Sequence, residues 1–170
     1  GLNVLAFDGG DQLKSAVGAL NLEELTVYIV LKSSTAAVPW CLPQQDNAHT
    51  WPYMRAGIDT FANYSQRING AVSTGDGSPA VGDDKWVLVR TESLTGNGYV
   101  NGLKRADATG EALTYPNSVP FIISGNGSGG ECVNGAVAHC IVYNSTPSSE
   151  DAERIEAYLN AKWRVYSTGT

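Results

Sequence analysis

Short runs of β-branched and aromatic residues, separated by turn residues, recur along the whole chain, and this alternation constrains the fold more than any other feature. The strongest runs cover residues 25–31 (LTVYIVL), 85–91 (KWVLVRT) and 136–143 (AVAHCIVY). Weaker strand patterns lie at residues 2–7, 53–60, 64–73, 98–103 and 119–124, and residues 12–15 extend the first of them along an edge. About eight to ten strands at this spacing predict an all-β sandwich of two antiparallel sheets.

The segments between these runs have the composition of tight turns. They include DGG at residues 8–10, GDGSP at 75–79, the Asn-Gly pair at 101–102 and GNGSGG at 125–130. The run at 25–31 is apolar at nearly every position, which is typical of a strand covered on both faces. The chain holds 19 glycines and only 16% charged residues, as expected for many short strands joined by turns.

One segment, SSEDAERIEAYLNAKW near the end of the chain, predicts an α-helix at about residues 149–163. Ser148 or Ser149 can cap its N-terminus, and acidic residues fill the first turn, where the helix dipole favours anions. An apolar stripe follows at helical spacing, formed by Ala152, Ile155, Leu159 and Trp163. A helix this short is marginal in water by itself, so we expect it to pack on the sandwich after the last strand.

The length of 170 residues is typical of one domain, so we expect a single sandwich over residues 1–170. The first residue is Gly, not Met, and a strand begins almost at once, so we expect a piece of a longer polypeptide or a processed one. No apolar run is long enough to span a bilayer, so we expect no membrane insertion. The net charge of -6 argues against a duplex nucleic acid as partner.

The sequence is compatible with two states of the three cysteines. Cys132 and Cys140 are close enough in sequence to pair across a turn, whereas the alternative is that they and Cys41 are small buried apolar residues. With two histidines and no Cys-x-x-Cys, a zinc site is not expected.

We expect no cofactor. Calcium stays possible for this class of sandwich, because several aspartates in turns and loops could supply oxygen ligands, although no spacing singles out a set. They are Asp8, Asp11, Asp46 and Asp59.

The segment GAVAHCIVYN at residues 135–144, followed by a turn and the helical string SEDAERIEAYLNAKW, resembles the C-terminal signature of laminin-G-like domains. These are jelly-roll domains of the concanavalin A-like lectin and glucanase class, and LamG-type modules are common in phage virion and bacterial surface proteins. The pieces FDGGDQL (7–13), LTVYIVLK (25–32), KWVLV (85–89), YVNG (99–102) and FIISG (121–125) resemble earlier strands in the right order. The ordered set carries the resemblance, since no single motif is specific. His139 departs from it, because the family usually has an acidic residue there.

The resemblance implies a lectin-like glycan-binding or adhesion module at a cell surface, in the extracellular space or on a virion. Its partner would then be a cell-surface glycan or polysaccharide. The main alternative is a structural or decoration domain of a capsid or tail that works by packing against neighbouring virion or surface-protein chains.

Related sandwiches also include glucan hydrolases, and this resemblance would imply acidic residues alternating along one strand as Glu-x-Asp-x-x-Glu. Glycoside cleavage needs such a pair of carboxyl groups on either side of the bound sugar. The dense acidic cluster here, Glu150, Asp151 and Glu153, lies instead in the first turn of the expected helix. We therefore expect no enzyme activity, and a glycoside hydrolase of this fold is the second and weaker alternative.

The candidate ligand site is the long loop at residues 39–52 together with the residue that follows it. Sugar sites combine a flat aromatic face with amides or carboxylates that hold the hydroxyl groups, and this loop has both. The candidate residues are Trp40, Gln45, Asp46, Asn47, His49, Trp51 and Tyr53. The competing interpretation is that Trp40 and Trp51 fold inward as the core of the loop itself.

Overall fold

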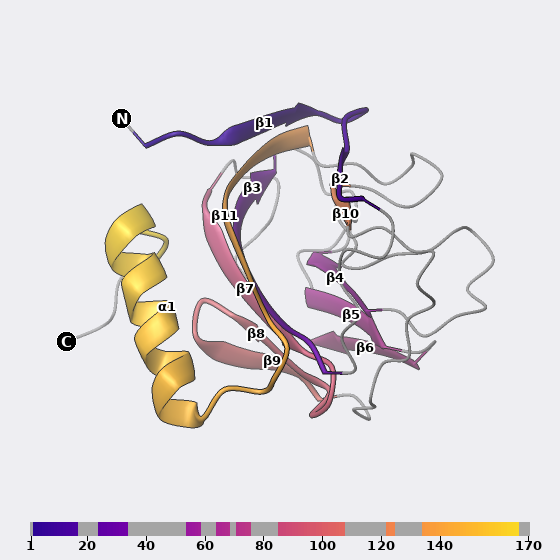
Figure 1. Ribbon diagram of the computed structural model, residues 1–170, viewed down its shortest axis with the longest axis vertical. Coiled ribbons are helices and arrows are strands. Elements are labelled where there is room, and N and C mark those ends of the chain that lie inside the picture. Colours follow the sequence, from indigo (N-terminus) through magenta and orange to yellow (C-terminus); the bar gives the residue numbers. More distant parts are fainter. Residues whose placement is uncertain are drawn as a thin grey trace.

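The structure is a computed structural model, and it describes residues 2–16, 24–33, 54–58, 64–68, 71–75, 85–107, 122–124 and 134–166. For residues 33, 54–58, 64–68, 71–75, 106 and 107 it describes the backbone only. In this part of the chain the elements are three antiparallel sheets and one helix (Figure 1).

The largest sheet has six strands, in the order β1-β11-β3-β7-β8-β9. Their bounds are β1 (Leu5–Asp8), β11 (Asn134–Tyr143), β3 (Thr26–Ser33), β7 (Val87–Glu92), β8 (Asn97–Val100) and β9 (Leu103–Asp107). All neighbours pair antiparallel.

Strand β3 lies in the middle of this sheet and is buried on both faces, as its sequence predicts. Val27, Ile29 and Leu31 point to one face, while Tyr28 and Val30 point to the other, because side chains alternate along a strand. All five are between 0% and 1% exposed. The sheet therefore carries a core on each side.

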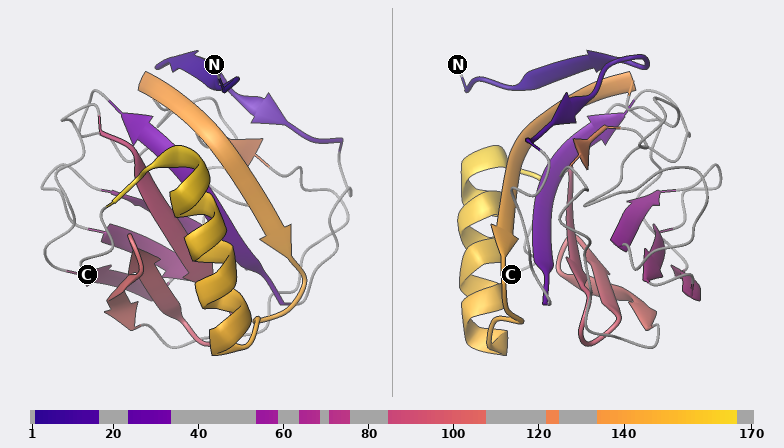
Figure 2. Two further views of the ribbon diagram at one scale, coloured as in Figure 1. Left: turned by 90° about the vertical axis from the view of Figure 1, so that its left-hand side faces the viewer. Right: turned by 45° about the vertical axis from the view of Figure 1, so that its right-hand side comes forward.

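A three-stranded sheet covers one of these faces. It consists of β4 (Met54–Ile58), β5 (Tyr64–Ile68) and β6 (Ala71–Gly75), and its strands β5 and β6 lie near β8 and β9. A short pair, β2 (Leu13–Lys14) with β10 (Ile122–Ile123), lies near β1 (Figures 1 and 2). The predicted two-layer antiparallel sandwich is thus confirmed.

Helix α1 (Ser149–Trp163) covers the opposite, outer face of the six-stranded sheet (Figure 2). Ser148 is the N-cap, and its hydroxyl accepts the N–H of Asp151 at 3.2 Å. Arg164 ends the helix in a left-handed conformation, with its N–H donating to the carbonyl of Asn160 at 2.7 Å. The predicted helix and its cap are confirmed. Within the described residues, no helix is long and apolar enough to cross a membrane.

The helix is held to the sheet by an apolar cluster. Leu159, 0% exposed, packs against Tyr28 and Val30 of β3 and Leu88 of β7. The partly buried residues around this centre are Trp86, Ala138, Ile141, Ile155, Trp163, Val165 and Tyr166. The rings of Trp86 and Trp163 lie 6.0 Å apart at a tilted angle. The predicted apolar stripe is the face of α1 that meets the sheet.

Two strand predictions were wrong in detail. Residues 12–15 do not extend an edge of the large sheet, because β2 pairs with β10 in a sheet of its own. Residues 64–73 are not one strand, since Ile68 pairs directly with Ala71 and the chain reverses between β5 and β6. An Asn-Gly pair separates these two strands in the sequence, and it is a strong signal for a tight hairpin turn.

Candidate functional site

The residues predicted to bind a glycan, Trp40, Gln45, Asp46, Asn47, His49, Trp51 and Tyr53, lie outside the described residues. Two of the four candidate calcium ligands, Asp46 and Asp59, do so as well. Asp8 closes a local turn, where its Oδ1 accepts the N–H of Gly10 at 2.9 Å. In the described part of the chain, no group of three or more His, Cys, Asp or Glu residues could hold a metal ion.

A polar cavity lies between α1 and the hairpin of β7 and β8, and we call it the helix–hairpin pocket. Its volume is about 390 Å³. The side chains and backbone that line it are those of Arg90, Glu92, Thr95, Asn97, Tyr99, Gly102, Thr146, Pro147, Ser149, Ala152, Glu153 and Glu156. Most of these residues are charged or carry hydroxyl or amide groups, so the cavity suits a polar ligand.

The pocket follows from the width of a single helix. A helix with its side chains is about 10–12 Å across, while strands lie about 4.8 Å apart. α1 packs on residues of β11, β3 and β7 and leaves β8 and β9 beyond its flank. The side of the helix and the uncovered hairpin therefore form a step, and polar residues line it.

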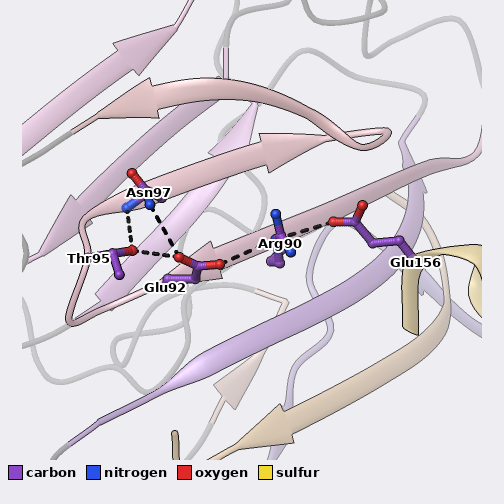
Figure 3. Close-up of polar contacts among 5 residues, drawn as sticks. All are labelled: Arg90, Glu92, Thr95, Asn97 and Glu156. Atoms are coloured by element: carbon purple, nitrogen blue, oxygen red, sulfur yellow. Dashed lines mark hydrogen bonds and ion pairs between the residues drawn. The ribbon is translucent and has the colours of Figure 1, made fainter. Parts of the chain in front are cut away.

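Arg90, on β7, is the central residue of this pocket and is 7% exposed. Its Nε lies 3.2 Å from Glu156 Oε1 and 3.5 Å from Glu92 Oε1 (Figure 3). Its guanidinium carbon lies 3.6 Å from the centre of the Tyr99 ring, a close cation–π contact. One cation therefore joins the helix, β7 and β8.

The carboxylate of Glu92 is held by the turn after β7. Its Oε2 accepts the hydroxyl of Thr95 at 2.6 Å and the amide Nδ2 of Asn97 at 3.4 Å (Figure 3). The hydroxyl oxygen of Thr95 also accepts the backbone N–H of Asn97 at 3.2 Å. These bonds fix Glu92 in place whether or not Arg90 is present.

Glu156 is held less completely than Glu92. It is 7% exposed, and its contact with Arg90 lacks hydrogen-bond geometry. Within the described residues, both Glu156 Oε1 and Arg90 Nε are buried without a hydrogen-bond partner. Two buried polar atoms of opposite charge thus face each other as an ion pair without a hydrogen bond, in two residues that line the pocket.

The pKa values reflect this arrangement. Burial raises the pKa of Glu156, and the attraction of Arg90 offsets that rise only in part. For Arg90, burial alone would lower the pKa, but the charge of Glu156, with smaller contributions from Tyr28 and Glu92, outweighs it and raises the pKa. The Tyr28 hydroxyl lies near enough to Arg90 to influence this balance, although it has no hydrogen bond of good geometry within the described residues. Arg90 is therefore held in its charged form, while burial favours the neutral form of Glu156.

The far wall of the pocket is a tight turn at Asn101 and Gly102, both with positive φ (52° and 78°). A Cβ at Gly102 would lie 3.4 Å from the Tyr166 hydroxyl and 3.5 Å from Glu156 Oε2. The hairpin turn, the chain after α1 and the buried carboxylate therefore meet at one place. This agrees with the tight turn predicted from the Asn-Gly pair.

Sequence reasoning missed Arg90, Glu92 and Glu156 as a group. The signal for Glu156 was present, because it follows Ala152 by four residues and precedes Leu159 by three, on the buried face of the helix. A charged residue on an apolar stripe needs a partner. Nothing in the sequence indicated that the partner is Arg90.

A second cavity, of about 330 Å³ and mostly apolar, lies where β1 meets β11. It is lined by Asn3, Val4, Leu5, Ile123, Val137, Ala138, His139 and Cys140. β1 pairs only with residues 134–137 of β11, so within the described residues the outer edge of β11 from residue 138 to 143 has no paired strand.

His139, which also lines this cavity, lies beside two aromatic rings of α1. The ring centres of Tyr158 and Trp163 are each 6.3 Å from that of His139. Burial, and to a smaller extent the charge of Lys162, lowers the pKa of His139.

Cys140 is a free thiol in the part of the chain that the structure describes, and Cys132 lies outside that part. Burial raises the pKa of the Cys140 thiol to about 12. By its accessible surface Cys140 is only partly buried, and it lines the apolar cavity beside β1. The acidic residues of the first helical turn are also in the role expected of them, since Asp151 bonds to the cap residue Ser148 and Glu150 pairs with Arg154.

No family model and no curated protein sequence matches the chain. Solved structures do match it in fold. The CBM40 domain of the Ruminococcus gnavus IT-sialidase, bound to α2,3-sialyllactose, has a TM-score of 0.69 and 12% identity over 90% of this chain and 95% of that one. Domain 4 of AbnA, an extracellular arabinanase from Geobacillus stearothermophilus in complex with arabinotriose, has a TM-score of 0.66 and 11% identity over 90% and 76%.

The mouse laminin α1 chain, domains LG4-5, is similar over 81% of this chain and 40% of that one, with a TM-score of 0.59 and 12% identity. Likeness at this level of identity demonstrates a common architecture. The chain therefore has the jelly-roll sandwich fold that laminin-G-like and lectin-like domains share, as the sequence resemblance implied.

Proposed function

We propose that the chain is a non-catalytic glycan-binding module. The observation that carries this proposal is the match to the sialidase CBM40 domain, which spans nearly the whole of both chains and is solved with an oligosaccharide. The arabinanase domain supports it independently, because it has the same architecture and is solved with arabinotriose. Two sandwiches of this size and shape thus hold short oligosaccharides.

We place the principal glycan site in the loop at residues 39–52 and Tyr53, on the strength of its composition. Trp40, Trp51 and Tyr53 offer aromatic faces for the apolar side of a sugar ring. Gln45, Asp46, Asn47 and His49 offer donors and acceptors for hydroxyl groups. Loops at the ends of sandwiches are common positions for binding residues.

The experiment is a glycan array probed with the wild-type chain and with Trp51→Ala. We expect at least one bound glycan to be lost with Trp51→Ala while the melting temperature stays near that of the wild type. Tyr158→Ala is the matched control, because it removes an aromatic side chain of α1 that is 53% exposed. An array without hits, or a loss shared by both variants, would remove the proposal.

The setting that we propose is extracellular, on a bacterial or virion surface, with the module attached to a longer chain. The sequence resemblance to LamG-type modules supports this setting, and so does the sialidase and arabinanase context of the similar domains. Mass spectrometry of the native protein, which would find the chain inside a secreted or virion polypeptide, tests it.

A second function, packing against neighbouring protein chains, is favoured by the edge of β11. Residues 138–143 of β11 carry no lysine, glutamate or proline, which are common protections of an exposed edge. Light scattering distinguishes the two functions. A monomer that binds sugars supports the glycan module, whereas a stable assembly without sugar binding supports packing.

A further inference from the structure

We infer that the helix–hairpin pocket is a second binding site, and that it takes a neutral, hydroxyl-rich sugar. The described residues that line it belong to α1, to the segment before α1, or to the β7–β8–β9 part of the large sheet. The inference goes beyond the proposed function, because it assigns a separate site and a ligand class to that site.

The first step is the unused hydrogen-bonding capacity of the pocket. Glu156 Oε1 is an acceptor and Arg90 Nε is a donor, and within the described residues both are buried without a hydrogen-bond partner. Buried polar atoms usually find partners, in protein or in an ordered ligand. A hydroxyl group is both donor and acceptor, so neighbouring hydroxyls of one ligand suit the carboxylate and the guanidinium together.

The second step is the charge of the lining. Glu92, Glu153 and Glu156 face a single cation, Arg90, so negative charge is in excess. An anionic ligand would meet carboxylates on the helix side and on the strand side. A ligand with an ammonium group would suit these carboxylates but would lie beside Arg90 and give it no acceptor. A neutral polyhydroxyl compound avoids both conflicts.

The third step is the order of the lining groups before a ligand arrives. Glu92 is already fixed by Thr95 and Asn97 (Figure 3). Arg90 is fixed against the ring of Tyr99. Side chains held in place lose little conformational entropy on binding. At about 390 Å³ the cavity is also within the size range of small-molecule sites.

Blocking the pocket from its rim tests the inference without disturbing the buried charges. Glu153 is exposed on α1 and lines the pocket, so Glu153→Trp places a bulky ring at the entrance. Ala157→Trp is the matched control, because Ala157 is exposed on the same helix and does not line the pocket. Asn97→Ala is a second pocket variant, which removes an amide from the floor.

The probes are neutral oligosaccharides, lactose among them, and their sialylated counterparts, on an array and then by calorimetry. We expect a neutral glycan to bind the wild type, to bind Glu153→Trp and Asn97→Ala about tenfold or more weakly, and to bind Ala157→Trp normally. The same glycan should bind Trp51→Ala normally, and its sialylated form should bind the pocket more weakly.

The outcomes separate this site from the proposed one. Neutral glycans that bind Glu153→Trp and Asn97→Ala as tightly as wild type overturn the pocket, and if they are lost with Trp51→Ala the proposed function stands. Glycans lost with Glu153→Trp and Asn97→Ala and kept by Trp51→Ala support the pocket alone. An array without any hit overturns both.

Discussion

The two halves of the contact between α1 and the large sheet differ in chemistry. The C-terminal half is apolar, where Leu159 and Trp163 pack on Val30, Leu88 and Trp86. The N-terminal half holds Ala152 and Ile155 of the apolar stripe, but it differs by a charged contact, where Glu156 meets Arg90 beside the helix–hairpin pocket. Both halves belong to one helix of 15 residues, so they share the same backbone and the same strands beneath.

This difference indicates that the two halves have different roles. Burial of apolar surface is favourable without directional constraints, so the C-terminal half attaches the helix. Burial of charge is costly unless the geometry is good, and the N-terminal half leaves two polar atoms without hydrogen bonds. A charged contact that does little for stability is the kind of arrangement found where a protein binds something.

The largest expected effect comes from removing the cation of the charged half. Arg90→Leu leaves two carboxylates, Glu92 and Glu156, buried and facing each other without a cation, and should lower the free energy of unfolding by about 3–5 kcal/mol. Urea denaturation measures it. Arg154→Leu is the control, because its surface ion pair with Glu150 should contribute no more than about 0.5 kcal/mol.

Adding Glu156→Leu to Arg90→Leu should recover part of the loss, since an apolar pair can replace a buried ion pair. Equal stabilities of Arg90→Leu and Arg154→Leu would mean that the charged half is not buried in solution.

The next largest effect comes from truncating the central side chain of the apolar half. Leu159→Ala removes the side chain at the centre of the apolar cluster and should cost about 3 kcal/mol, through lost burial and the cavity left behind. The same denaturation measurement applies, with Tyr158→Ala as an exposed control on the adjacent position. A cost under about 1 kcal/mol would show that the helix does not depend on this contact.

The smallest expected effect is a change in how the unfolding free energy depends on pH. Burial raises the pKa of Glu156 above its ordinary value of 4.5, so the folded state holds this proton to higher pH than the unfolded state does. The contribution of Glu156 to stability is therefore greatest below the ordinary pKa, and it falls as the pH rises from there through the raised pKa.

Glu156→Gln should lack this fall, so the difference in unfolding free energy between wild type and Glu156→Gln should change with pH across that window. Leu159→Ala has no such group and should keep the pH profile of the wild type. Parallel profiles of wild type and Glu156→Gln would contradict the raised pKa.

The apolar half of this contact could be predicted from sequence, and the charged half could not. The spacing of Ala152, Ile155, Leu159 and Trp163 gives the buried face directly, because helical periodicity is local. The Ser148 cap and the Asn101–Gly102 turn are local too, and both are found as expected. The pairing of Arg90 with Glu156 depends on how α1 crosses β7, which no local pattern contains.

The strand errors have the same origin. Residues 12–15 have a strand pattern, but only the tertiary fold places them beside β10 and not at an edge of the large sheet. Residues 64–73 hold an Asn-Gly pair inside an otherwise continuous run, and the turn it favours outweighs the β propensity on either side. The loop predicted to bind a glycan lies outside the described residues and stays a prediction.

Cys140 gives the protein a reporter of its own opening. The thiolate is the species that reacts with alkylating reagents, and at neutral pH a thiol with a pKa of about 12 is almost wholly protonated. Cys140 is only partly buried, and it lines the cavity beside the stretch of β11 that β1 does not cover. The rate at which Cys140 is modified in native buffer would therefore report how often this edge of the sandwich opens, and its increase with pH would report the ionisation of the thiol.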